Sequence, residues 1–115
     1  MSKKADRPLV IDMIQSIEKV LEYTGGMDEA AFTADRLTRD AVIYNIQIIG
    51  EAASKLSDQI KSIHHEVPWH QVIGMRHRLV HEYGQVRIDI IWRVASIHIP
   101  PLLGQLKKIL EEGVE

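Results

Sequence analysis

Helical periodicity runs through almost all of this 115-residue chain and restricts its fold more than any other feature. Apolar residues recur every three to four positions, and the alternation typical of a β-strand is nearly absent. The composition, 45% hydrophobic and 26% charged, is that of a globular protein, and without cysteine no disulfide or thiolate metal site can form. We therefore predict one all-α domain that spans residues 1–115.

The periodicity predicts an up-and-down bundle of four main helices. These long helices are expected at about residues 9–24, 35–56, 68–83 and from 87 onward, with short helical turns at 28–32 and 58–65. Gly25 and Gly26 should end the first helix, because glycine is the usual residue after a helix C-terminus. Pro100 and Pro101 must kink or break the C-terminal helix, because each proline removes a backbone donor and clashes with the preceding turn.

The second long helix has two apolar stripes. One contains Val42, Ile46, Ile49, Ala53 and Leu56, and the other contains Leu37, Ala41, Tyr44, Ile48 and Ala52. A small bundle rarely covers one helix on both sides. One stripe is therefore expected to pack inside the bundle and the other against a second subunit, in a homodimer.

Charge is distributed unevenly. The net charge is only −2, which is not typical of a nucleic-acid-binding chain, but residues 69–93 contain four arginines and two acidic residues. No apolar stretch approaches the roughly 18 residues that a transmembrane helix needs, and the N-terminal residues are polar. We expect no membrane insertion and a cytoplasmic location.

The segment 74–84 concentrates arginine, histidine, glutamate and tyrosine around one helix end. Arg76 and Tyr83 lie about 20° apart around a helix and share a face. His81 lies about 140° from Arg76 and about 40° from His77. Arg76 and His81 therefore converge only if the arginine reaches across the helix or another surface, such as a second subunit, closes the site.

These side chains suit the cleavage of RNA without a metal. A histidine can remove the proton of a ribose 2′-hydroxyl or protonate the leaving oxygen near neutral pH. An arginine can stabilise the charge that builds on the phosphorane oxygens. Tyr83 could stack on a base or hydrogen-bond a phosphate.

Other readings of the same residue types stay open. The histidines at 64, 65, 70 and 98 are more often ordinary surface residues than ligands. The arginines at 78, 87 and 93 can simply pair with Glu82 and Asp89, and Trp92 fits the core better than a base-stacking surface. His77 and His81 have the i, i+4 spacing of helical metal sites, but no third ligand is evident, so no metal or other cofactor is expected.

The pattern Arg76-x4-His81-x-Tyr83 resembles the R-x4-H-x-Y motif of the HepT-like toxins, a branch of the HEPN superfamily. Residues 44–53 resemble the second helix of that family. Residues 68–69 and 73–76 resemble its entry into the motif helix, and residues 86–92 resemble the segment that follows. The resemblance therefore covers most of the chain.

This resemblance implies a homodimeric helical bundle with metal-independent ribonuclease activity. It also implies a neutralising partner, an MntA-type minimal nucleotidyltransferase antitoxin. The motif residues of the active site map onto Arg76 and His81, and the tyrosine that the antitoxin adenylylates maps onto Tyr83. The position after the motif arginine is often asparagine, whereas this chain has His77, an accessory residue of undefined role.

The sequence thus favours an endoribonuclease toxin of a type VII-like toxin-antitoxin pair, with His81 as general acid or base and Arg76 stabilising the transition state. The alternative is a non-catalytic subunit whose basic cleft binds a nucleotide or presents a substrate to a nucleotidyltransferase. Loss of RNA cleavage in His81→Ala would separate the two.

Overall fold

All regular structure in the computed structural model is helical within the residues that it describes, 5–81 and 87–115. The elements are α1 (Asp6–Thr24), α2 (Glu29–Ala34), α3 (Arg36–Lys55), α4 (Asp58–Ile63), α5 (Trp69–His81), α6 (Ile88–Arg93), a π-helical turn η1 (Val94–His98) and α7 (Pro100–Glu112). The predicted all-α class is confirmed. The prediction of four main helices is corrected to seven α-helices and one π-helical turn in these ranges.

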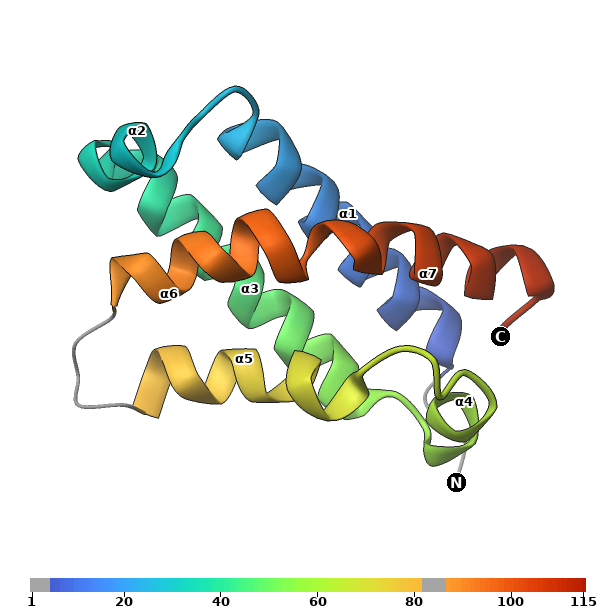
Figure 1. Cartoon of the computed structure of the whole chain (residues 1–115). Helices are drawn as coiled ribbons and strands as arrows, with labels where there is room; N and C mark the ends of the chain where they lie inside the picture. The colour runs from blue at the N-terminus through green and yellow to red at the C-terminus, as the bar shows by residue number, and fades with distance from the viewer. Residues whose placement is uncertain (1–4, 82–86) are drawn as a thin grey trace.

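The difference in helix number has two causes. The segments expected as short turns are complete helices of six residues each, α2 and α4. The expected C-terminal helix is divided into α6, η1 and α7. In Figure 1, α1, α3, α5 and the α6 to α7 segment run in alternating directions, as expected of an up-and-down arrangement.

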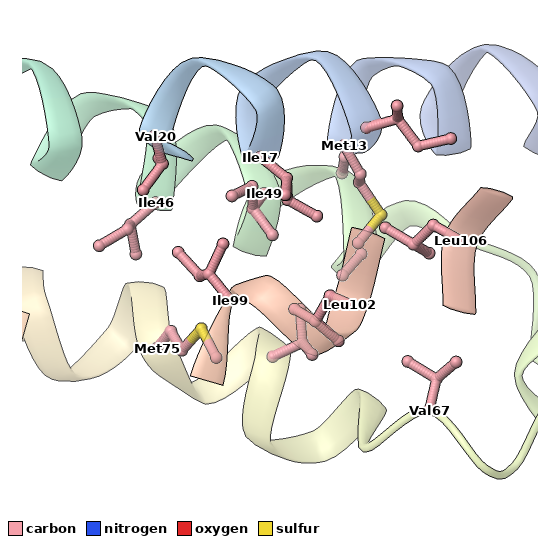
Figure 2. Close-up of a cluster of buried hydrophobic side chains, with 14 of the residues drawn as sticks. Met13, Ile17, Val20, Ile46, Ile49, Val67, Met75, Ile99, Leu102 and Leu106 are labelled. Carbon is pink, nitrogen blue, oxygen red and sulfur yellow. The ribbon is translucent and has the colours of Figure 1, made fainter. Parts of the chain in front are cut away.

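The core lies where α1 packs on α3 and where α7 crosses α1. Fully buried side chains include Met13, Ile17 and Val20 of α1, Ile46 and Ile49 of α3, and Leu102 and Leu106 of α7. Figure 2 shows these side chains meeting between the helices, together with Met75 of α5. The predicted inner stripe of α3 is therefore confirmed, because all five of its residues are buried.

Side-chain caps mark the starts of three helices. Asp28 accepts a hydrogen bond from the Ala31 amide at the start of α2, and Asp35 accepts one from the Thr38 amide at the start of α3. Ser57 caps α4, and its own amide and hydroxyl donate to the Asp6 carboxylate at 2.9 and 2.6 Å. Asp6 thereby ties the start of α1 to the loop between α3 and α4.

The predicted break at the proline pair is confirmed as a π-helical turn. The amide of Ile99 donates to the carbonyl of Val94, five residues earlier, at 2.9 Å. A wider turn suits this place because Pro100 and Pro101 have no amide hydrogen and their rings clash with a normal preceding turn. The buried residues Ile91, Val94, Ala95 and Ile99 still face the core across this turn.

The helix α5 runs beside α3 and carries the motif residues towards the end of the bundle where α6 begins (Figure 1). Its first residue, Trp69, is buried and donates from its indole nitrogen to the His64 carbonyl at 3.0 Å. The helix is described as far as His81, so the predicted end near Tyr83 and the cap at Gly84 lie outside the described residues. Within the described ranges, no helix is both long and apolar enough to cross a bilayer.

Candidate active site

Arg76 lies where α5 packs closely on α3 at Gly50. A Cβ atom added at Gly50 of α3 would lie 2.6 Å from the Cβ of Arg76, closer than real Cβ atoms approach. Only glycine at position 50 therefore permits this helix spacing. The absence of a side chain at Gly50 lets the base of the Arg76 side chain lie against α3. Helical periodicity alone assigns no such role to Gly50.

The guanidinium of Arg76 pairs with Glu51, also on α3. The Arg76 Nη1 and Glu51 Oε1 atoms are 3.7 Å apart, and the two side chains are 46% and 47% exposed. An ion pair this open to solvent contributes little to stability, because water and salt screen it. Glu51 therefore orients Arg76 without preventing it from binding another anion.

Arg76 also lines a hollow of about 320 Å³ between α5, α3 and α1. Its other lining residues include Glu51, Tyr44, Gln47, Ile48 and Lys55, and we call it the Arg76 hollow. Two cationic side chains, Arg76 and Lys55, and two carboxylates, Asp12 and Glu51, contribute to this surface. The formal charges of this lining balance, so the group suited to a phosphate is the half-exposed Arg76 guanidinium and not a net positive surface.

His77 lies on a different side of α5. It lines a second hollow, of about 670 Å³, which we call the histidine hollow. The lining residues are His70, Gln71, Ile73, Gly74, Met75 and His77 of α5 together with Ile90, Val94 and His98. His70 and His98 are exposed, as expected of ordinary surface residues, and both share this hollow with His77. His70 and His77 are seven residues apart on α5, so helical spacing alone could have predicted that they share a face. Only the tertiary fold places His98 beside the same hollow.

The convergence of Arg76 with His81 stays a prediction. His81 is the last described residue of α5, but its side chain and the whole of Tyr83 lie outside the described residues. Arg76 and His77, by contrast, are both exposed and line the two separate hollows. The motif helix therefore offers a cation on one side and an imidazole on the other.

One of the simple charge pairs that the sequence allowed is present, between Arg87 and Asp89, whereas the side chain of Arg78 and the whole of Glu82 lie outside the described residues. Arg87 donates to the Asp89 carboxylate from Nη2 at 2.6 Å and from Nε at 3.2 Å. These hydrogen bonds hold the pKa of Asp89 below its ordinary value. Trp92 packs against Phe32 with ring centroids 5.2 Å apart, as expected of a residue near the core.

The described residues contain no cluster of three or more histidine, aspartate or glutamate side chains that could hold a metal ion. The three histidines around the histidine hollow are thus not arranged as a metal site. The guanidinium of Arg76 and the imidazole of His77 are the groups of α5 whose chemistry suits charge stabilisation and proton transfer.

Residues 13–109 match the family described as "HepT-like", or "Ribonuclease HepT-like". A similar protein from Caldanaerobacter subterraneus subsp. tengcongensis, named "Putative RNase TTE0752", is 35% identical over 109 residues, 95% of this chain and 97% of the relative. Another, from Thermococcus cleftensis, is named "Probable ribonuclease HepT". It is 32% identical over 107 residues, which cover 93% of this chain and 97% of that relative. No solved structure matches the chain.

Proposed function

Because the chain belongs to the HepT-like ribonuclease family and is itself a ribonuclease, we propose that it is a metal-independent endoribonuclease. We further propose that it is the toxin of a type VII-like toxin-antitoxin pair that acts in the cytoplasm. The observation that carries the proposal is the position of Arg76, whose half-exposed guanidinium lines an open hollow on the helix that also contains His81.

The proposed reaction needs one attacking and one leaving oxygen. The ribose 2′-oxygen loses its proton and attacks the adjacent phosphorus, and the bond to the 5′-oxygen of the next nucleotide breaks. That oxygen takes up a proton, so the products are a cyclic phosphate and a free 5′-hydroxyl. His81 serves as general acid or base, and Arg76 stabilises the negative charge on the two non-bridging oxygens. His77 is an accessory residue.

A second copy of the chain is proposed to complete the site. Leu37 and Tyr44, which belong to the predicted outer stripe of α3, are 81% and 64% exposed, whereas Ala52 of that stripe is already buried within the single chain. Tyr44 and Ile48 of the same stripe line the Arg76 hollow. A partner that covered these apolar side chains would also cover one side of the hollow, which supports a homodimer with the active site at its interface.

Neutralisation is proposed to come from an MntA-type minimal nucleotidyltransferase. The hydroxyl oxygen of Tyr83 would lose its proton and attack the α-phosphorus of ATP, with release of pyrophosphate and formation of a phosphodiester between the tyrosine oxygen and AMP. The family resemblance of the motif supports this step, and the spacing of Arg76 and Tyr83 in the sequence, which predicts one helical face for both, supports its effect. An anionic phosphodiester on the helical face of Arg76 would compete with RNA for the guanidinium.

Two substitutions test the catalytic pair. Arg76→Ala and His81→Ala should each lower the rate of RNA cleavage by a factor of about 10² to 10³, because each removes a group that acts in the transition state. Cleavage is measured on a labelled RNA with chelator present, and melting is followed by circular dichroism. Arg36→Ala and His65→Ala are matched controls, because both residues are exposed on other parts of the chain.

The controls should cleave at the wild-type rate, and all four variants should melt close to the wild type. Full activity in both Arg76→Ala and His81→Ala would rule out the proposed pair. Loss of all cleavage on addition of a chelator, restored by a divalent metal, would rule out the metal-independent mechanism. A wild-type chain that binds RNA but never cleaves it would instead support the non-catalytic subunit.

A further inference from the structure

The histidine hollow is the larger of the two hollows beside α5, with a volume of about 670 Å³ against about 320 Å³. Its walls combine apolar side chains with polar edges. Ile73 and Met75 come from α5, and Ile90 and Val94 come from α6 and η1. A small number of polar groups on a mostly apolar wall is the usual composition of a site for a small ligand.

The polar groups of the hollow can all hydrogen-bond. His70 and Gln71 contribute from the first turn of α5, and His98 contributes from η1. Imidazole and carboxamide groups both donate and accept hydrogen bonds, and an imidazole ring also stacks on other rings. A flat ligand with an apolar face and a polar edge fits this lining better than a simple anion does.

The hollow lies beside the proposed reaction centre. His77 is part of its lining, and the backbone of His81 follows one turn later on α5. Arg76 lines the other hollow, between α5 and α3. An RNA chain whose phosphate reaches this end of α5 would therefore carry a neighbouring base past the histidine hollow.

We propose that the histidine hollow is a base subsite, which receives the nucleobase of a nucleotide next to the cleaved phosphate. This inference rests on the proposed function and adds to it the chemical class that the hollow recognises. The faces of the base pack on Ile73, Met75, Ile90 and Val94, and its edge is read by His70, Gln71 and His98. The volume falls in the range of about 300 to 1,000 Å³ that is common for ligand sites.

Two other occupants fit less well. A metal ion is disfavoured because no group of three possible ligands in the described ranges is arranged to hold one. A second copy of the chain is better accommodated on α3, where Leu37 and Tyr44 are exposed beside the Arg76 hollow.

Gly74 allows the hollow to be filled without damage to the core. It lines the hollow, and a Cβ atom added there would have nothing within 4 Å. Gly74→Leu should therefore fold and place a side chain where the base would bind. We expect KM for a short RNA to rise about tenfold, which is within the usual effect of losing one base stack. kcat at saturating RNA should change much less.

Gly104→Leu is the matched control, because Gly104 is also a helix glycine with open space around its Cβ position. It should leave KM unchanged. His98→Ala is a second test at the polar edge, and it should change the preference among RNAs that differ in one base. If Gly74→Leu and His98→Ala both behave like Gly104→Leu, the base subsite is wrong.

A direct binding experiment on the wild-type chain tests the base subsite independently of RNA cleavage. AMP, GMP, CMP and UMP are titrated, with ribose 5-phosphate as the control without a base, while the methyl resonances of Met75, Ile90 and Val94 are followed by NMR. At least one nucleotide should shift these resonances, and ribose 5-phosphate should not. Equal shifts with ribose 5-phosphate, or none with any nucleotide, would overturn the subsite. A chain that cleaves no RNA would overturn the proposed function, while this titration still decides the subsite.

Discussion

Gly50 lies in the interior of α3, where glycine costs a helix about 1 kcal/mol relative to alanine. The packing of α3 against α5 explains why glycine is present at position 50 despite this cost. The position faces Arg76 of α5, and any side chain there would meet the arginine at its own Cβ. Since the contact involves the base of the Arg76 side chain and not its flexible end, it can be relieved only by moving one helix.

Gly50→Ala should therefore reduce both stability and activity. The overpacked contact should lower the free energy of unfolding by about 1 to 3 kcal/mol, and the displaced Arg76 should lower kcat. Gly104→Ala is the control, because a Cβ atom has open space there. Thermal unfolding and RNA cleavage are compared between the two variants. Equal stability and activity in both would show that the helix spacing does not position Arg76.

Tyr83 is expected to act as a switch and not as a catalyst. Incubation with the cognate nucleotidyltransferase, ATP and magnesium should add adenylyl mass that peptide mapping assigns to Tyr83, and cleavage should fall without unfolding. Tyr83→Phe should escape modification and stay active beside the partner. Modification of Tyr83→Phe, or full activity of the modified chain, would leave simple binding as the means of neutralisation.

Asp35 connects two elements, because it ends α2 and caps α3. Its carboxylate accepts a hydrogen bond from the Thr38 amide at 3.0 Å, and this bond is the main cause of a pKa below the ordinary value of 3.8. A depressed folded-state pKa means that the charged carboxylate stabilises the fold at neutral pH. This contribution is lost as the pH falls below 3.8 and through the folded-state pKa.

Asp35→Asn should separate the effect of the carboxylate charge from the effect of the capping hydrogen bond. Asparagine also caps helices well, but it has no charge to interact with the helix dipole. The variant should melt below the wild type at pH 7, and the difference should disappear in acid. Asp35→Ala, which removes the cap itself, should melt lower at every pH. A difference between wild type and Asp35→Asn that does not change with pH would contradict the pKa argument.

The periodic patterns of the sequence predicted the helices better than they predicted the contacts between helices. The stripe of α1 and the inner stripe of α3 are clear periodic signals, and the proline pair marked the break before α7. The π-helical turn was not predicted, because the buried residues around it keep a spacing that a normal helix also satisfies. The contact of Gly50 with Arg76 and the approach of His98 to His77 depend on packing between separate helices, which periodicity does not report.

At the scale of the whole molecule, the exposed side chains of α3 are the main evidence for a partner. Leu37 and Tyr44 are the two most exposed of these apolar residues, and they lie on the side of α3 that was predicted to face a second subunit. A charged residue placed in an apolar interface is costly, because it must be desolvated without a partner.

The double variant Leu37→Glu with Tyr44→Glu should therefore be a monomer with little RNA cleavage, whereas the wild type should be a dimer at micromolar concentration. Light scattering gives the mass, and cleavage is assayed at the same concentrations. Ile63→Glu is the control, since Ile63 is also exposed but lies on α4. A wild-type monomer that cleaves RNA would rule out the shared site.

In the proposed homodimer, contacts through the exposed Leu37 and Tyr44 of α3 would also make activity depend on abundance. If two copies are needed for one site, the number of sites rises with the square of the chain concentration while most chains are still monomers. A few copies per cell would then cleave little RNA, and a modest rise in expression would produce a disproportionate rise in cleavage. The affinity of the α3 surface for its own copy would set that threshold, so substitutions at Leu37 or Tyr44 should change the chain concentration at which RNA cleavage begins before they change the chemistry of its site.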